Sequence, residues 1–73
     1  MISKDYHGIR VGDALDDLNR IIGEVRLSRR TEYAEFITGY GLIREAFHVN
    51  LRAHGLTPTY KLGNEGVIVV TIE

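Results

Sequence analysis

Two residue patterns alternate along this chain, and their order restricts the possible folds more than any other feature. In two segments the apolar residues recur at the i, i+3, i+4, i+7 spacing of an amphipathic helix. The first of these predicted helices begins at Val11 and frays near residues 28–30, and the second runs from about residue 41 to residue 54. Stretches rich in aromatic and β-branched residues predict strands at residues 2–7, 33–38, 58–62 and 67–72. The predicted order is therefore β-α-β-α-β-β.

Glycine and proline mark the ends of these segments. Gly55 suits the left-handed position after the second helix, where Leu56 can contact Leu51 in a Schellman motif. Pro58 ends any helical continuation and places the third strand at a sheet edge, because proline donates no ladder hydrogen bond. Residues 63–66 are predicted to form the turn before the last strand.

The connections between the segments predict the sheet order. Right-handed crossovers that step in the same direction place both helices on one face of the sheet. The last strand, residues 67–72, is apolar on both faces, so we expect it to be central, and a short hairpin makes it antiparallel to its neighbour. We therefore predict an α/β two-layer sandwich with a four-stranded mixed sheet of order 1-2-4-3. Its helix-free face should be more polar or covered by a partner.

Length and composition exclude several classes of protein. The 73 residues include no cysteine, so a single small domain must be stabilised by packing rather than by disulfides. No apolar run approaches the ~18 residues of a membrane span, and residues 1–5 contain no apolar signal core. A reducing, cytoplasmic location is expected. The net charge of -1 excludes a uniformly basic nucleic-acid binder but allows a local basic patch.

The loops after the first two strands are the candidate site. They cover residues 5–8 and 38–41, and they should lie side by side at the sheet edge where open α/β sheets bind ligands. The glycines of the second loop let backbone amides approach a ligand, and the following helix N-terminus favours an anion such as phosphate. A tight strand-to-helix turn explains the same glycines equally well.

Three side chains near these loops have residue types suited to phosphate chemistry. Asp5 and His7 are two residues apart and would share a face of a strand, where a carboxylate favours the charged imidazole of a general acid or base. The alternative is that His7 caps the loop and Asp5 is a solvated edge residue. Arg44, in the first turn of the second helix, opposes the helix dipole, which is explained by a phosphate contact or by exposure to solvent.

Tyr40 and Arg10 extend this candidate site. Tyr40, between two glycines, either stacks on a base or packs against the first helix. Arg10 adds a positive charge beside the first loop. The other aromatic residues are expected in the core or on the sheet face: Tyr6, Tyr33, Tyr60, Phe36 and Phe47.

Further basic residues lie away from these loops. Arg26, Arg29 and Arg30 end the first helix, where they either compensate the dipole or contact a nucleic-acid backbone that extends past the site. His48 and His54 are six residues apart and do not share a helix face, so they are not predicted to bind a metal together.

Taken together, the two loops resemble the motifs of the Smr (small MutS-related) domain family. That family carries L-D-x-H-G near its start and H-G-x-G or T-G-x-G after its second strand. Residues 5–8 match the first motif from its Asp onward, and residues 38–41 match the second in its threonine form. Residues 42–46 resemble the family's following stretch, and residues 63–70 resemble its final turn and strand. The resemblance covers essentially all of residues 1–73, as a single Smr-like domain.

The chain departs from the family pattern at two positions and in one loop. Lys4 replaces the usual leucine and removes an apolar anchor beside the first motif. The glycine loop lacks the longer insertion of many members. Thr38 stands where many members have histidine, so no second imidazole is available for catalysis.

The resemblance implies nucleic-acid binding and, in many members, endonuclease activity on branched or nicked DNA or on RNA. By this resemblance Asp5 and His7 are the expected catalytic pair and Arg44 the charge stabiliser. The expected phosphate-binding residues are Gly8, Arg10, Thr38, Gly39, Tyr40 and Gly41. We expect cleavage that requires no cofactor, because no carboxylate cluster predicts a two-metal site. One divalent metal on Asp5 is the alternative, and with RNA the 2′-hydroxyl could be the nucleophile.

Two other functions fit the sequence. The chain could be a non-catalytic nucleic-acid-binding module of a larger protein, or a protein-interaction module that uses the helix-free face. The near-neutral charge favours the second slightly, since phosphate neutralisation normally needs clustered Lys and Arg. The expected partner is DNA or RNA, with other domains of a parent protein as further candidates and no membrane. The sequence does not predict the oligomeric state.

Overall fold

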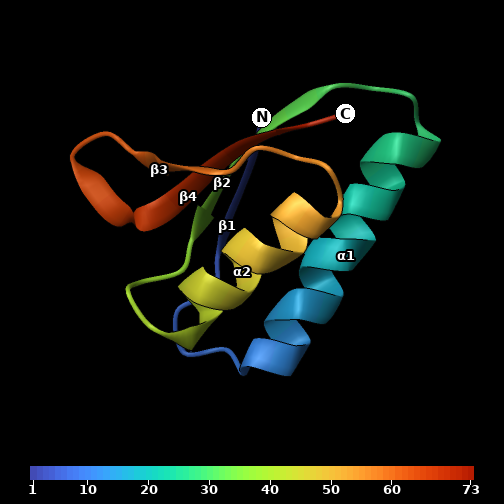
Figure 1. The fold of residues 1–73 in the computed structure, drawn as a ribbon. Coiled ribbons are helices and arrows are strands. Elements are labelled where there is room, and N and C mark those ends of the chain that lie inside the picture. Colours follow the sequence, from blue (N-terminus) through green and yellow to red (C-terminus); the bar gives the residue numbers. More distant parts are fainter.

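Four strands and two helices follow one another in the order that the sequence predicts (Figure 1). The computed structural model describes all of residues 1–73. Its elements are β1 (Ile2–Asp5), α1 (Val11–Leu27), β2 (Glu32–Ile37), α2 (Leu42–Ala53), β3 (Thr59–Lys61) and β4 (Asn64–Ile72). Neither helix has the length and apolar character that crossing a lipid bilayer requires.

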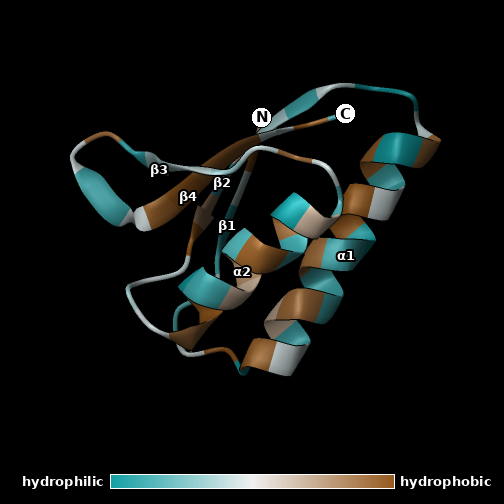
Figure 2. Cartoon of the chain, in the orientation of Figure 1, coloured by the Kyte–Doolittle hydropathy of each residue, from teal (hydrophilic) through white to brown (hydrophobic).

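The sheet has the predicted order β1-β2-β4-β3. β1 pairs with β2 in parallel, with Ile2 opposite Ala34, and β4 pairs antiparallel with both β2 and β3. β4 is central because its apolar side chains cover both faces, and Figure 2 shows hydrophobic colour along most of its length. The prediction of a mixed four-stranded α/β sandwich is confirmed.

Both helices pack on one face of the sheet and form the core with it (Figure 1). Tyr6 contacts Phe36 of β2 and Phe47 of α2, with ring centroids 6.0 and 4.9 Å away, and these rings meet edge to face or at a tilt. The largest fully buried side chains are Phe36, Phe47, Leu18, Ile22, Leu51, Ile68 and Ile72. Burial of these side chains holds the two layers together.

The end of α2 follows the predicted Schellman pattern. The Gly55 amide donates to the Arg52 carbonyl at 2.9 Å, and the Leu56 amide donates to the Leu51 carbonyl at 3.0 Å. Gly55 has a φ of 78°, which is the left-handed conformation that glycine adopts at least cost. Leu56 is buried, so the helix ends against the core.

The first strand is shorter than the sequence predicts. β1 ends at Asp5 rather than at residue 7, because the Asp5 Oδ1 atom accepts a hydrogen bond from the His7 amide at 2.8 Å and turns the chain. Gly8 completes the turn with a φ of 78°. His7 therefore lies in the turn, and the prediction that Asp5 and His7 share one face of a strand is wrong.

The β3–β4 hairpin is tighter than predicted. Lys61 pairs with Asn64, so only Leu62 and Gly63 connect the strands, rather than a turn over residues 63–66. Gly63 alone supplies the positive φ, 83°, that this short connection uses. β4 consequently begins three residues earlier than expected, at Asn64 rather than residue 67.

Candidate functional site

The loops after β1 and β2 leave the sheet side by side, as predicted. Asp5 pairs with Ile37 in the parallel register, and the Tyr6 amide donates to the Ile37 carbonyl at 2.9 Å. Figure 1 shows both loops at the same end of the sheet, where each leads into the N-terminus of a helix. The candidate site residues of the two loops therefore belong to one edge of the molecule.

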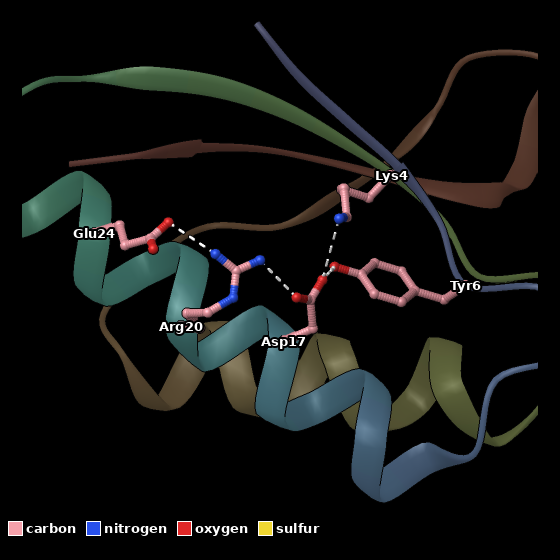
Figure 3. Close-up of polar contacts among 5 residues, drawn as sticks. All are labelled: Lys4, Tyr6, Asp17, Arg20 and Glu24. Atoms are coloured by element: carbon pink, nitrogen blue, oxygen red, sulfur yellow. Dashed lines mark hydrogen bonds and ion pairs between the residues drawn. The ribbon is translucent and has the colours of Figure 1, made fainter.

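Tyr6 fixes the first loop to the core. Its side chain is 3% exposed, and its hydroxyl donates to the Asp17 Oδ2 atom of α1 at 2.7 Å (Figure 3). Burial, and then the bond to Asp17, raise the pKa of Tyr6 well above its ordinary value. The same bond, followed by one from Arg20, lowers the pKa of Asp17. Asp17 therefore holds the residue that directly precedes His7.

A chain of ion pairs surrounds this bond (Figure 3). Arg20 Nη2 lies 2.7 Å from Asp17 Oδ1, and Arg20 Nη1 lies 2.9 Å from Glu24 Oε1. Lys4 Nζ lies 3.6 Å from Asp17 Oδ2. Lys4 thus lies on the helix side of an edge strand and forms an ion pair there. This pairing explains how a lysine is accommodated where the Smr motif has leucine.

The role of Asp17 was not predicted from the sequence. The i, i+3 spacing of Asp17 and Arg20 and the i, i+4 spacing of Arg20 and Glu24 were readable as helix-surface pairs. Nothing in those spacings indicated that Tyr6, eleven residues before Asp17, would reach the same carboxylate.

The first loop presents His7 to solvent. Its imidazole forms no hydrogen bond or ion pair within the protein, and Gly8 and Arg10 beside it are also exposed. The Ile9 amide closes the turn on the Tyr6 carbonyl at 3.1 Å. Asp5 uses a carboxylate oxygen on the His7 backbone, so it positions the turn that carries the imidazole.

The second loop is tied to β4 through one carbonyl. The Thr38 and Gly39 amides donate to the Gly66 carbonyl at 2.9 and 3.0 Å, and Thr38 Oγ1 lies 3.3 Å from the same oxygen. Thr38 is buried, and Gly39 has a φ of 70°. Thr38 and Gly39 therefore shape the loop, whereas the amides of Tyr40 and Gly41 donate no hydrogen bond to another backbone group.

Neither helix N-terminus at this edge is capped by a side chain. Arg10 precedes α1 and Gly41 precedes α2, and no side chain at either position accepts a hydrogen bond from the helix amides. Uncapped amides and the positive end of each helix dipole favour an anion at such a place. Both helix starts at this edge therefore favour negative charge.

Arg44 lies apart from His7. Its Cζ atom is 4.1 Å from the centroid of the Tyr60 ring in β3 and 5.3 Å from that of Tyr40. Tyr60, Ile68, Phe36 and Lys4 form one row across the four strands. Three interstrand spacings therefore separate Tyr60 from β1, a distance of about 14 Å. The structure brings the two loops together but places the guanidinium of Arg44 toward the opposite edge of the sheet.

The basic residues at the end of α1 lie at the other end of the molecule. Arg26 donates to the His54 carbonyl at 2.7 Å and to the Glu73 carbonyl at 3.1 Å. Arg30 lies 3.4 Å from Glu32 in an ion pair. These contacts join α1 to the end of α2 and to the last strand, so they favour a structural role for Arg26 and Arg30.

The class of protein is therefore a two-layer α/β domain with a sheet of order 1-2-4-3, two helices on one face and glycine-containing loops after β1 and β2. The chain matches the crystal structure of the Smr domain of Thermus thermophilus MutS2 with a TM-score of 0.75, over 100% of this chain and 99% of that chain. The two sequences are 22% identical. Neither a protein-family model nor a curated protein sequence matches the chain. The structural match establishes the fold that the sequence motifs indicated.

Proposed function

We propose that this chain is a nucleic-acid-binding domain of the Smr type, and that the edge where β1 and β2 end cleaves phosphodiester bonds. One observation carries the proposal: an exposed imidazole, loop amides that donate to no backbone group and two uncapped helix N-termini occur together at that edge. The similar fold of the Smr domain of MutS2 supports it.

The residues of the site divide into those that react and those that position. Phosphodiester cleavage needs proton transfer at the nucleophile or leaving group and stabilisation of phosphate charge. His7 supplies the proton transfer. The amides of Tyr40 and Gly41 and the N-terminus of α2 receive the phosphate. Asp5 acts by holding the turn that presents the imidazole.

The remaining candidates support this arrangement from either side. Arg10 and Gly8 flank His7 in the first loop, where Arg10 adds positive charge and Gly8 provides the turn. Thr38 and Gly39 keep the second loop attached to β4. Arg44 contributes charge toward β3, beyond the phosphate that His7 would act on.

The test is cleavage of end-labelled single-stranded RNA, duplex DNA and branched DNA, each with and without a chelator. We expect His7→Ala to reduce cleavage by about 100-fold or more, as is usual for a general acid or base, while affinity for the same substrate changes little. His54→Ala removes an imidazole at the opposite end of the molecule and should leave cleavage unchanged.

Each result decides one part of the proposal. If His7→Ala cleaves at the rate of wild type, the catalytic role of His7 is excluded. Binding without cleavage supports the non-catalytic module instead. With RNA, a 2′-deoxy substitution at the scissile position that leaves the rate unchanged excludes the 2′-hydroxyl as nucleophile.

A second candidate function uses the helix-free face of the sheet. Tyr33 and Ile37 of β2 are 43% and 39% exposed there, beside the half-buried Val69 of β4. The ion pair between Lys61 and Glu35, at 3.0 Å, lies on the same face. An apolar patch with charged residues beside it is typical of a protein-interaction surface, and such binding would respond little to salt.

A further inference from the structure

Four side chains form a cluster on the β3 side of α2, which we call the aromatic–arginine cluster: Tyr40, Arg44, His48 and Tyr60. Arg44 lies over the rings of both tyrosines, at 5.3 Å from Tyr40 and 4.1 Å from Tyr60. The ring of His48, one turn further along α2, stacks on Tyr60 with centroids 5.9 Å apart and an angle of 26° between the planes. Cation–π contacts of this kind orient a guanidinium without fixing its hydrogen bonds.

The hydrogen-bonding groups of this cluster are incompletely used. In the whole chain, two buried side-chain nitrogen atoms have no hydrogen-bond partner, Arg44 Nε and His48 Nδ1. Both belong to the cluster. Such groups are costly to bury, and each needs a structural or functional explanation. Tyr40, at the outer end of the cluster, is 68% exposed.

The one anionic partner of Arg44 is weakly held. Arg44 Nη2 lies 3.7 Å from Glu65 Oε1, beyond hydrogen-bond distance, and the Glu65 side chain is 68% exposed. Exposed ion pairs of this kind contribute little stability. A phosphate oxygen can therefore replace Glu65 at a small cost, with a shorter and charge-assisted hydrogen bond.

We propose that the aromatic–arginine cluster binds an unpaired nucleotide of single-stranded nucleic acid, with its base stacked on Tyr40 and its phosphate on Arg44 in place of Glu65. This inference rests on the proposed function and extends it, since it names the substrate as single-stranded near the site. The bases of an intact duplex are stacked on one another and cannot reach Tyr40. Base stacking on aromatic side chains is the usual means of binding single strands.

The first test compares Tyr40→Ala with Tyr33→Ala, which removes an exposed tyrosine from the opposite face. Affinities are measured for a fluorescent single-stranded oligothymidylate and for an abasic oligonucleotide of equal length. Stacking is worth about 1–3 kcal/mol per base, which corresponds to about 5-fold or more in affinity. We expect Tyr40→Ala to lower the affinity for the oligothymidylate by that factor and to leave the affinity for the abasic strand unchanged. Tyr33→Ala should have the affinity of wild type for both strands.

The second test is a gain of affinity, which no folding defect can imitate. Glu65→Gln removes the competitor of the phosphate and should tighten binding of the oligothymidylate by about 3-fold or more, as expected from charge-assisted pairing. Glu35→Gln removes the same charge from the helix-free face, where Glu35 pairs with Lys61. We expect no comparable gain from this control.

The outcomes separate this inference from the proposed function. Wild-type binding that neither Tyr40→Ala nor Glu65→Gln changes overturns the inference and leaves nucleic-acid binding in place. Equal gains from Glu65→Gln and Glu35→Gln show only a net-charge effect and overturn it also. A wild-type chain that binds no single-stranded or duplex oligonucleotide overturns both.

Discussion

Tyr6 connects the interior of this protein to its candidate site at the scale of a single residue. Its ring packs between Phe36 and Phe47, while its hydroxyl reaches Asp17 at 2.7 Å. Its neighbours in sequence, Asp5 and His7, are exposed. The buried tyrosine therefore gives the exposed turn a fixed starting point, which the catalytic role proposed for His7 requires.

We predict that Tyr6→Phe lowers the free energy of unfolding by about 1–2 kcal/mol at pH 7, because a hydrogen bond to a charged carboxylate is lost. The ring remains, so the core packing should be preserved. Urea unfolding followed by circular dichroism measures the difference. Tyr33→Phe is the matched control, since the Tyr33 hydroxyl has no hydrogen-bond partner in the protein.

The pH dependence of this difference follows from the two shifted groups. The pKa of Tyr6 is raised above its ordinary 10.0, so its stabilising contribution is complete below pH 10 and is lost as the pH rises further. The pKa of Asp17 is lowered below its ordinary 3.8, so its contribution is complete above that pH and is lost as the pH falls further. Wild type should therefore lose stability relative to Tyr6→Phe above pH 10, where the buried hydroxyl ionises, and below pH 3.8, where Asp17 is protonated. A difference that stays constant as the pH falls below 3.8 would contradict the assigned bond.

At the scale of elements, the β3–β4 hairpin supports the second loop. The Gly66 carbonyl accepts the amides of Thr38 and Gly39, and a side chain at Gly66 would lie 3.2 Å from Tyr40 Cε2 and 3.5 Å from Gly39 Cα. The hairpin turn at Gly63 has open space around it but a φ of 83°. The hairpin thus contains two glycines with different roles. Gly66 is needed for the close approach of the second loop, and Gly63 is needed for its backbone conformation.

We predict that alanine at Gly66 mainly lowers affinity, whereas alanine at Gly63 mainly lowers stability. Gly66→Ala should displace Tyr40 and weaken single-strand binding several-fold, with a stability loss under about 1 kcal/mol, because its contacts are tight but can relax. Gly63→Ala should cost about 1–2 kcal/mol of stability, because a Cβ is strained at positive φ, and should leave affinity unchanged. Thermal unfolding and oligothymidylate titration of both variants give the comparison. Equal losses of affinity would show that Gly66 has no specific effect on Tyr40.

The elements themselves were predictable, and the contacts between them were less so. Helical periodicity and the two-sided apolar character of β4 led directly to the observed sheet order. The end of β1 was misplaced because one hydrogen bond from the His7 amide to Asp5 outweighs the strand preference of residues 6 and 7. The direction of the Arg44 side chain could not be predicted, since it depends on Tyr60, which lies sixteen residues later on β3.

At the scale of the whole molecule, few basic side chains remain free for phosphate. The chain has 9 Lys plus Arg against 10 Asp plus Glu. Arg20 and Lys4 are engaged with Asp17, and Arg26 with the end of α2 and with Glu73. Arg10 and Arg44 are the basic residues close to the loops. Binding to nucleic acid should therefore depend on a small number of phosphate contacts and on stacking.

This distribution predicts a shallow salt dependence. If about two phosphates are neutralised, the logarithm of the affinity for a single strand should fall with the logarithm of salt with a slope of about -1.4. Arg44→Gln should reduce the slope by about 0.7, because one phosphate contact is lost. Arg52→Gln changes an exposed arginine in the last turn of the same helix, so it is the control and should leave the slope unchanged.

Two other outcomes would contradict this prediction. If the affinity of wild type for its partner does not change with salt, the protein-interaction surface on the helix-free face is favoured. A slope several times steeper would show that the nucleic acid contacts more of the surface than the two loops and the aromatic–arginine cluster.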